Sequence, residues 1–162
     1  MPIEIRSIQP EVVPAAKELI LQVARAIFQW HETLEETRRR FEEQGILKDV
    51  DELGSYYLNG GGTFLVALGA ERVIGTGAIH AITVEIAEIK RLWLLEAYWG
   101  QGTGYRLVQG LLRFAREHGY RRVRLQTDRR QARAMRFYQR VGFYSIPCES
   151  QDPDDACWEL EL

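Results

Sequence analysis

Cysteine is scarce in this chain of 162 residues, with only Cys148 and Cys157 present. Their spacing is not that of a metal site, and two cysteines are too few for a disulfide framework. We therefore expect free thiols, no metal site, and a reducing cytoplasmic compartment. The first ten residues, MPIEIRSIQP, also lack the basic-then-apolar pattern of a secretory signal.

Long apolar runs, strong net charge and internal repeats are missing as well. No apolar run approaches the roughly 18 residues of a membrane helix, so we expect no membrane partner. The formal net charge is −2, so no global field attracts nucleic acid. The length favours one domain spanning residues 1–162.

Hydrophobic periodicity predicts a mixed α+β chain. The predicted strands cover residues 3–8, 63–68, 72–82, 84–95, 122–127, 143–146 and 157–162. The predicted helices cover residues 11–31, 33–45, 51–58, 102–118 and 131–141. Four strands before the long central helix indicate a sheet that starts antiparallel. The strand–helix–strand order over residues 88–127 then adds a local parallel pair.

Three glycines at alternate positions, Gly100, Gly102 and Gly104, stand between an apolar strand and an amphipathic helix. Glycine permits a sharp turn and close backbone approach, and the first N–H groups of a helix attract anions. A P-loop would need Lys-Ser/Thr after the last glycine, and a dinucleotide fingerprint would need glycine at position 105, which is Tyr105. What remains is a G-x-G-x-G phosphate site.

The segment LWLLEAYWGQGTGYRLVQGLL resembles the signature of the GNAT superfamily of acetyl-CoA-dependent N-acetyltransferases, Q/R-x-x-G-x-G/A. The pattern's glycines fall on Gly102 and Gly104, whereas Trp99 stands where the family has Gln or Arg. The resemblance implies the GNAT fold, a central mixed sheet of about seven strands flanked by helices, with acetyl-CoA as cosubstrate. The CoA-contacting residues that it implies are Leu94, Leu95, Glu96, Gln101, Gly102, Thr103, Gly104, Tyr105 and Gln131.

Glu88 is the candidate proton acceptor, because it lies in an apolar strand where alternation predicts that it shares a face with Leu92 and Leu94. Such a carboxylate is either paired or set at a functional site. It also falls where histone-type members of the superfamily carry their general base. A structural or substrate-binding role, a water-mediated role, and the alternatives Glu85 and His80 all stay open.

Tyr138 is the candidate proton donor. The segment ARAMRFYQRVGF resembles the family's A-x-x-F/L-Y-x-x-x-G-F motif, whose tyrosine lies beside the CoA sulfur. A free phenol titrates near pH 10 and so can give its proton to a departing thiolate. The alternative is an ordinary core tyrosine.

The acyl acceptor is not readable from the sequence beyond a primary amine of a small molecule or peptide. Family position suggests that Trp30, His31, Tyr56 and Tyr57 line or cover its site. Two other functions compete: a catalytically silent acyl-CoA-binding sensor, and a nucleotide-binding protein that uses the same glycine loop. Dimers are the common oligomeric state for such a domain.

Overall fold

The computed structural model describes residues 2–162 and contains a seven-stranded mixed sheet in the order β1-β2-β3-β4-β5-β7-β6. The strands are β1 (Glu4–Ser7), β2 (Thr63–Gly69), β3 (Arg72–Ala81), β4 (Ile86–Leu94), β5 (Arg122–Asp128), β6 (Tyr144–Ile146) and β7 (Asp155–Glu161). Neighbouring strands pair antiparallel except for β4 and β5, which are parallel. The predicted mixed sheet, antiparallel at its start, is confirmed.

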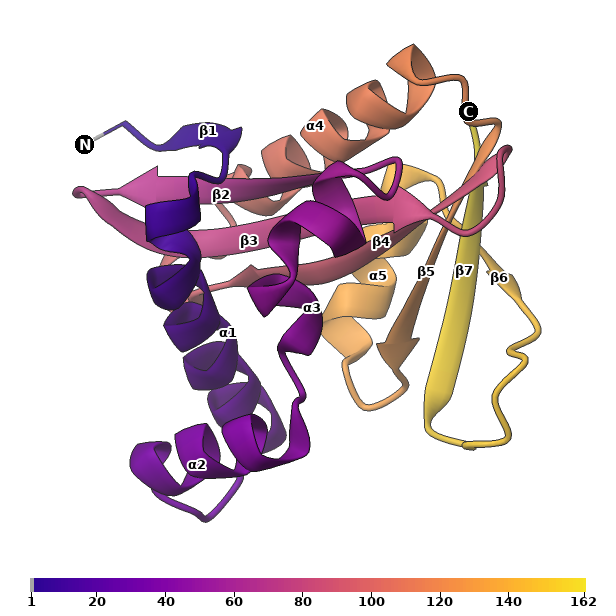
Figure 1. Cartoon of the computed structure of the whole chain (residues 1–162). Coiled ribbons are helices and arrows are strands. Elements are labelled where there is room, and N and C mark those ends of the chain that lie inside the picture. The colour runs from indigo at the N-terminus through magenta and orange to yellow at the C-terminus, as the bar shows by residue number, and fades with distance from the viewer. Residues whose placement is uncertain (1) are drawn as a thin grey trace.

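Helices cover both faces of this sheet. They are η1 (Pro10–Val12), α1 (Val13–Phe28), α2 (Leu34–Gln44), α3 (Lys48–Asp51), η2 (Leu53–Leu58), η3 (Glu96–Tyr98), α4 (Thr103–Glu117) and α5 (Ala132–Val141). Figure 1 shows α1 and α3 in front of β2, β3 and β4, with α4 behind them. No helix within residues 2–162 is long and apolar enough to cross a membrane.

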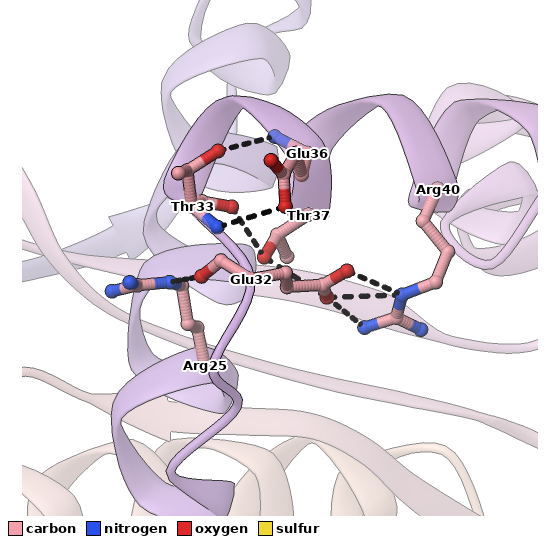
Figure 2. Close-up of polar contacts among 6 residues, drawn as sticks. All are labelled: Arg25, Glu32, Thr33, Glu36, Thr37 and Arg40. Atoms are coloured by element: carbon pink, nitrogen blue, oxygen red, sulfur yellow. Dashed lines mark hydrogen bonds and ion pairs between the residues drawn. The ribbon is translucent and has the colours of Figure 1, made fainter.

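Helix ends follow local chemistry, with two departures from expectation. The predicted first helix ran to residue 31, but α1 ends at Phe28 because Gln29 is left-handed, with φ +53°. The second helix begins with the expected capping box, in which Thr33 and Glu36 exchange side-chain and backbone hydrogen bonds (Figure 2). The predicted helix over 51–58 is instead the short α3 followed by the π-helical η2.

The apolar residues divide between the two faces of the sheet. Behind it, α4 and α5 bury residues such as Leu111 and Tyr138 against Ile89 and Leu125. In front, α1 and η2 bury Ile20, Tyr57 and their neighbours against Phe64 and Ala78. The two cores leave β4 covered on both faces, so groups on this strand are held by packing from either side.

The parallel pair of strands separates halfway along its length. β4 and β5 pair only from Ile86–Arg122 to Ile89–Leu125, although β4 continues to Leu94 and β5 to Asp128. Figure 1 shows β5, β7 and β6 running away from the line of β4. The second half of β4 therefore has a backbone edge without a strand partner on its β5 side.

A bulge in β4 overturns one expectation about side-chain direction. Lys90 pairs with Ala78 and Trp93 pairs with Thr76, so two residues of β4 face a single residue of β3. The extra residue reverses the alternation after position 90. Glu88 consequently lies on the front face, whereas Leu92 and Leu94 pack toward α4, and the predicted shared face is wrong.

The cysteines are not free, contrary to expectation, because Cys148 and Cys157 form a disulfide. Antiparallel pairing of β6 with β7 sets Ile146 opposite Cys157, which brings Cys148 back toward β7. The two Cα atoms are 5.4 Å apart, within the range that a disulfide spans. Spacing along the chain gave no indication of this register.

Candidate active site

A cavity of about 1110 Å³ opens where β4 and β5 separate. Its walls come mainly from the second half of α1, the end of β4, the glycine loop with the start of α4, and the length of α5, with Arg72 added from β3. The charged residues in its lining are Arg72, Glu96, Arg130, Arg133 and Arg140. Arg130 is already paired with Asp128 at 2.7 Å, which leaves three guanidinium groups against one carboxylate in the lining, and this balance favours an anionic occupant.

The glycine loop presents an uncapped helix end to this cavity. Gly100 and Gly102 have φ of +75° and +86°, a conformation that side-chain-bearing residues rarely adopt. Gly102 is the N-cap of α4, and no side chain accepts the first N–H groups of that helix. Since Gly102, Gly104 and Tyr105 all line the cavity, these donors are available to an anion there.

The N-terminus of α5 meets the same cavity and is also uncapped. Gln131 is its N-cap and makes no side-chain capping bond. The Arg133 guanidinium lies 4.7 Å from the centre of the Trp99 ring, and the Trp99 indole donates to the Leu94 carbonyl at 2.9 Å. Trp99, the departure from the GNAT pattern, thus connects the end of β4 to α5 across the mouth of the cavity.

Tyr138 is the one predicted catalytic residue that lines the cavity. Its side chain is buried. Burial raises the pKa of Tyr138 above its ordinary value of 10, because the low-dielectric surroundings disfavour the phenolate. The phenol is therefore protonated throughout the neutral range, as a proton donor must be.

Glu88 lies outside the cavity lining, at the last part of β4 that still pairs with β5. Its Oε1 is 2.9 Å from Nε2 of His80, the residue opposite it on β3. His80 in turn packs against the rings of Tyr56 and Tyr57. Histidine thus holds the carboxylate, whereas Lys90, two residues further along β4, donates to the Tyr56 hydroxyl at 2.9 Å.

The expected CoA-contacting residues divide into two groups. Those that line the cavity are Leu94, Leu95, Glu96, Gly102, Gly104, Tyr105 and Gln131. Gln101 is exposed and donates to the Ala97 carbonyl, and Thr103 is buried; neither side chain lines the cavity. Their backbone lies in the same turn, so a role for these two would be a main-chain one.

Sequence reasoning missed the wall that α1 supplies. Gln22, Val23, Ala26 and Ile27 line the cavity, but an apolar helix face looks the same whether it fills a core or borders a cavity. Trp30 and His31, which family position suggested for the acceptor site, line a smaller hollow of about 600 Å³ beside the α1–α2 loop. Tyr56 and Tyr57 do not line the main cavity either.

The α1–α2 loop is fixed by Glu32 (Figure 2). Its carboxylate accepts three charged bonds from Arg40, the shortest at 2.6 Å, and one from the Thr37 hydroxyl. The Glu32 carbonyl accepts from Arg25 at 2.7 Å. Hydrogen bonding from Arg40 lowers the pKa of Glu32. This network connects Arg25 near the end of α1 to Arg40 of α2.

Comparison with known proteins agrees with this geometry. A split between two parallel strands, with a glycine turn and a helix N-terminus at its mouth, defines a site for an extended ligand that ends in a phosphate. The family model described as "Acetyltransferase (GNAT) family" matches residues 26–143. The chain belongs to this family.

Its relatives include N-acetyltransferase 8B of Homo sapiens, which is 36% identical over 111 residues, 64% of this chain and 48% of that protein. The uncharacterized N-acetyltransferase YjgM of Escherichia coli is 29% identical over 107 residues, 62% of this chain and 64% of that protein. The chain therefore spans about half to two thirds of the length of these relatives.

Solved structures of low sequence identity share the fold over the whole chain. An acetyltransferase from Streptococcus agalactiae has a TM-score of 0.82 and 23% identity, covering 99% of this chain and 98% of its own. The PaiA N-acetyltransferase of Thermoplasma acidophilum, solved in complex with coenzyme A, has a TM-score of 0.80 and 23% identity, with full coverage of both chains. The seven-stranded sheet flanked by helices is thus the GNAT fold.

Proposed function

We propose that the chain moves an acetyl group from acetyl-CoA to a primary amine of a small molecule or peptide. The observation that carries this proposal is the meeting, in one cavity, of an unpaired strand edge, two uncapped helix N-termini and a buried tyrosine. Each of these features answers one requirement of acyl transfer from a thioester.

Holding the donor is the first requirement. The N–H groups at the start of α4 would bind the diphosphate of CoA, with Gly102 and Gly104 allowing close approach. The pantetheine arm would lie along the free edge of β4 at Leu94 and Leu95 and pair with its backbone like an added strand. Arginines at the mouth, including Arg130 and Arg133, would offset the charge of the phosphates.

Moving protons is the second requirement. A departing CoA thiolate needs a proton, which the hydroxyl of Tyr138 in the cavity lining would donate. The attacking ammonium must lose a proton, which the Glu88–His80 pair would accept. Because Glu88 lies outside the lining, this transfer would run through water rather than by direct contact.

Direct attack in a ternary complex fits better than a covalent acetyl-enzyme. A thioester intermediate would need a cysteine thiolate at the cavity. Both cysteines are joined to each other, and neither belongs to the cavity lining. The amine itself is then the nucleophile.

Two measurements test the proposal. Calorimetric titration with acetyl-CoA should show binding, and an assay of thiol release against a panel of amines should show turnover with at least one of them. The panel should include amino acids, polyamines, aminoglycosides and peptide N-termini. Binding without turnover across the panel would favour the silent acyl-CoA sensor, whereas the absence of acetyl-CoA binding would overturn both readings. A thermal shift with ATP or NAD but not acetyl-CoA would point to a nucleotide-binding protein.

A further inference from the structure

The β4 bulge contains a residue in a costly backbone conformation. Arg91 has φ +56° and is one of four non-glycine residues in the described chain, residues 2–162, with positive φ. An L-residue with a side chain is disfavoured in this region by contact between its Cβ and the backbone. The conformation persists only where surrounding contacts determine it.

The Arg91 side chain is fixed by a buried ion pair with the helical layer in front of the sheet. Its Nε and Nη2 donate to the two Asp49 carboxylate oxygens at 3.0 and 2.7 Å, and Nη2 also donates to the Ile46 carbonyl at 2.8 Å. Tyr57, which is fully buried, donates its hydroxyl to the same carboxylate. The Asp49 side chain is only 7% exposed and the Arg91 side chain 18%.

The Arg91 backbone is fixed by a second buried contact, from β3. Thr76 on β3 is fully buried, and its hydroxyl donates to the Arg91 carbonyl at 2.7 Å. The side chain and the carbonyl of Arg91 are therefore each held by a buried partner, one from α3 and the other from β3. Although burial alone would raise the pKa of Asp49, the hydrogen bonds from Arg91 and Tyr57 lower it, so the pair stays charged.

Stability alone does not account for this arrangement. A buried ion pair loses the hydration of both charges, and the gain from pairing commonly only offsets that loss. Here the pair holds a backbone conformation that is itself unfavourable. The position of Arg91 supplies the reason. The cavity wall formed by the end of β4 and the start of η3 begins at the next residue, Leu92, and continues through Ala97.

We infer that Arg91 is a positioning residue for acyl-CoA. Held by Asp49 and Thr76, Arg91 sets the direction of the free β4 edge that receives the pantetheine arm. The bulge turns Leu92 and Leu94 toward the cavity and presents their backbone along it. Because Asp49 belongs to α3, the same contact ties the helices in front of the sheet to the donor site. This inference rests on the proposed function.

The test compares two probes and three variants. Acetyl-CoA carries the pantetheine arm, whereas 3′-phosphoadenosine 5′-diphosphate carries only the nucleotide and diphosphate. Arg91→Lys keeps the charge but loses the two-pronged contact with Asp49. Thr76→Val keeps the side-chain shape and releases the Arg91 carbonyl. The control, Arg40→Lys, disrupts the similar two-pronged pair with Glu32, of which neither residue lines the cavity (Figure 2).

We expect Arg91→Lys and Thr76→Val each to bind acetyl-CoA about tenfold more weakly, which corresponds to the loss of one or two hydrogen bonds. Their affinity for 3′-phosphoadenosine 5′-diphosphate should stay within about twofold of the unaltered chain, and amide hydrogen exchange over residues 90–95 should rise. Arg40→Lys should leave both affinities unchanged. If Arg91→Lys fails to fold, Thr76→Val decides.

Two results would overturn the inference while leaving the proposed function intact. One is an equal loss of affinity for both probes, which would indicate a general structural role. The other is unchanged acetyl-CoA affinity in folded variants. If the unaltered chain binds no acetyl-CoA, the proposed function fails and this inference fails with it.

Discussion

Replacing Gly104 with alanine should raise the stability of the fold while lowering the affinity of the anion site, so the two effects can be measured separately. Gly104 is the second residue of α4, and it lines the cavity. A Cβ there would lie 3.8 Å from Phe137 and 4.0 Å from Leu94, which is ordinary van der Waals contact, and its φ lies outside the left-handed region. Because alanine favours a helix over glycine by about 0.5–1 kcal/mol, the free energy of unfolding should rise by up to that amount.

The same methyl group should weaken acetyl-CoA binding. It would project between Leu94 and Phe137, both of which line the cavity, and hold the diphosphate away from the first N–H groups of α4. Losing one hydrogen bond to a charged group costs about 1.5–3 kcal/mol, which corresponds to a dissociation constant roughly 10- to 150-fold higher. A variant that melts about 2–4 °C higher yet binds its ligand more weakly is hard to explain by damage to the fold.

Thermal melting measures the change in stability, and calorimetric titration with acetyl-CoA measures the change in affinity. Alanine variants of two other glycines serve as controls. Gly102→Ala and Gly119→Ala each place a side chain at positive φ, +86° and +83°, in open space, and each should lose about 1–2 kcal/mol of stability. Only Gly102 borders the cavity, so only Gly102→Ala should also lose affinity. If Gly104→Ala binds acetyl-CoA as tightly as the unaltered chain, the diphosphate does not lie at the N-terminus of α4.

Four further predictions follow from the site and the fold. Tyr138→Phe should lower kcat about 10²- to 10⁴-fold while leaving acetyl-CoA affinity near normal, as steady-state kinetics and calorimetry can establish. Glu88→Gln should lower kcat and flatten a pH–rate profile that otherwise favours alkaline conditions; unchanged kcat in both variants would remove these two roles. Reducing the disulfide, or replacing Cys148 with serine, should lower the free energy of unfolding by about 2–3 kcal/mol, the chain-entropy value for a separation of 9 residues. Acetyl-CoA affinity should not change, and an unaltered melting temperature would contradict this estimate. The pKa of Asp49 is lowered in the fold from 3.8, so its stabilising contribution is present above about pH 4 and is lost as the pH falls through the folded value. Denaturant titrations between pH 5 and 2 should therefore show a shallower loss of stability in Asp49→Asn than in the unaltered chain.

Local signals predicted the order of elements and the glycine loop well. A capping box at Thr33, a glycine at position 142 and alternating apolar residues each act over a few neighbouring residues, so the sequence displays them directly. The sheet order and the separation of β4 from β5 beyond Ile89 depend on contacts between distant segments, which local patterns do not display.

Long-range register accounts for what the sequence could not reveal. Alternation along residues 84–95 assumed a regular strand, and a single extra residue at the Arg91 bulge reversed every side chain beyond it. The Cys148–Cys157 disulfide depends on how β6 pairs with β7, which neither cysteine indicates by itself. The bulge is stabilised by Asp49, 42 positions away in the chain, so no local pattern could have marked it.

The bulge also gives a physical reason for two substrates to meet at one strand. Before it, Glu88 lies on the front face of the sheet with His80; after it, Leu92 and Leu94 turn toward α4 and the cavity. A donor held along the free edge would bring its thioester to the place where this change of face occurs, and an amine arriving over the front face would pass the carboxylate first. If β4 and β5 paired along their full length, the sheet would separate the donor from the base. The split between the strands is therefore as necessary to the proposed reaction as either side chain.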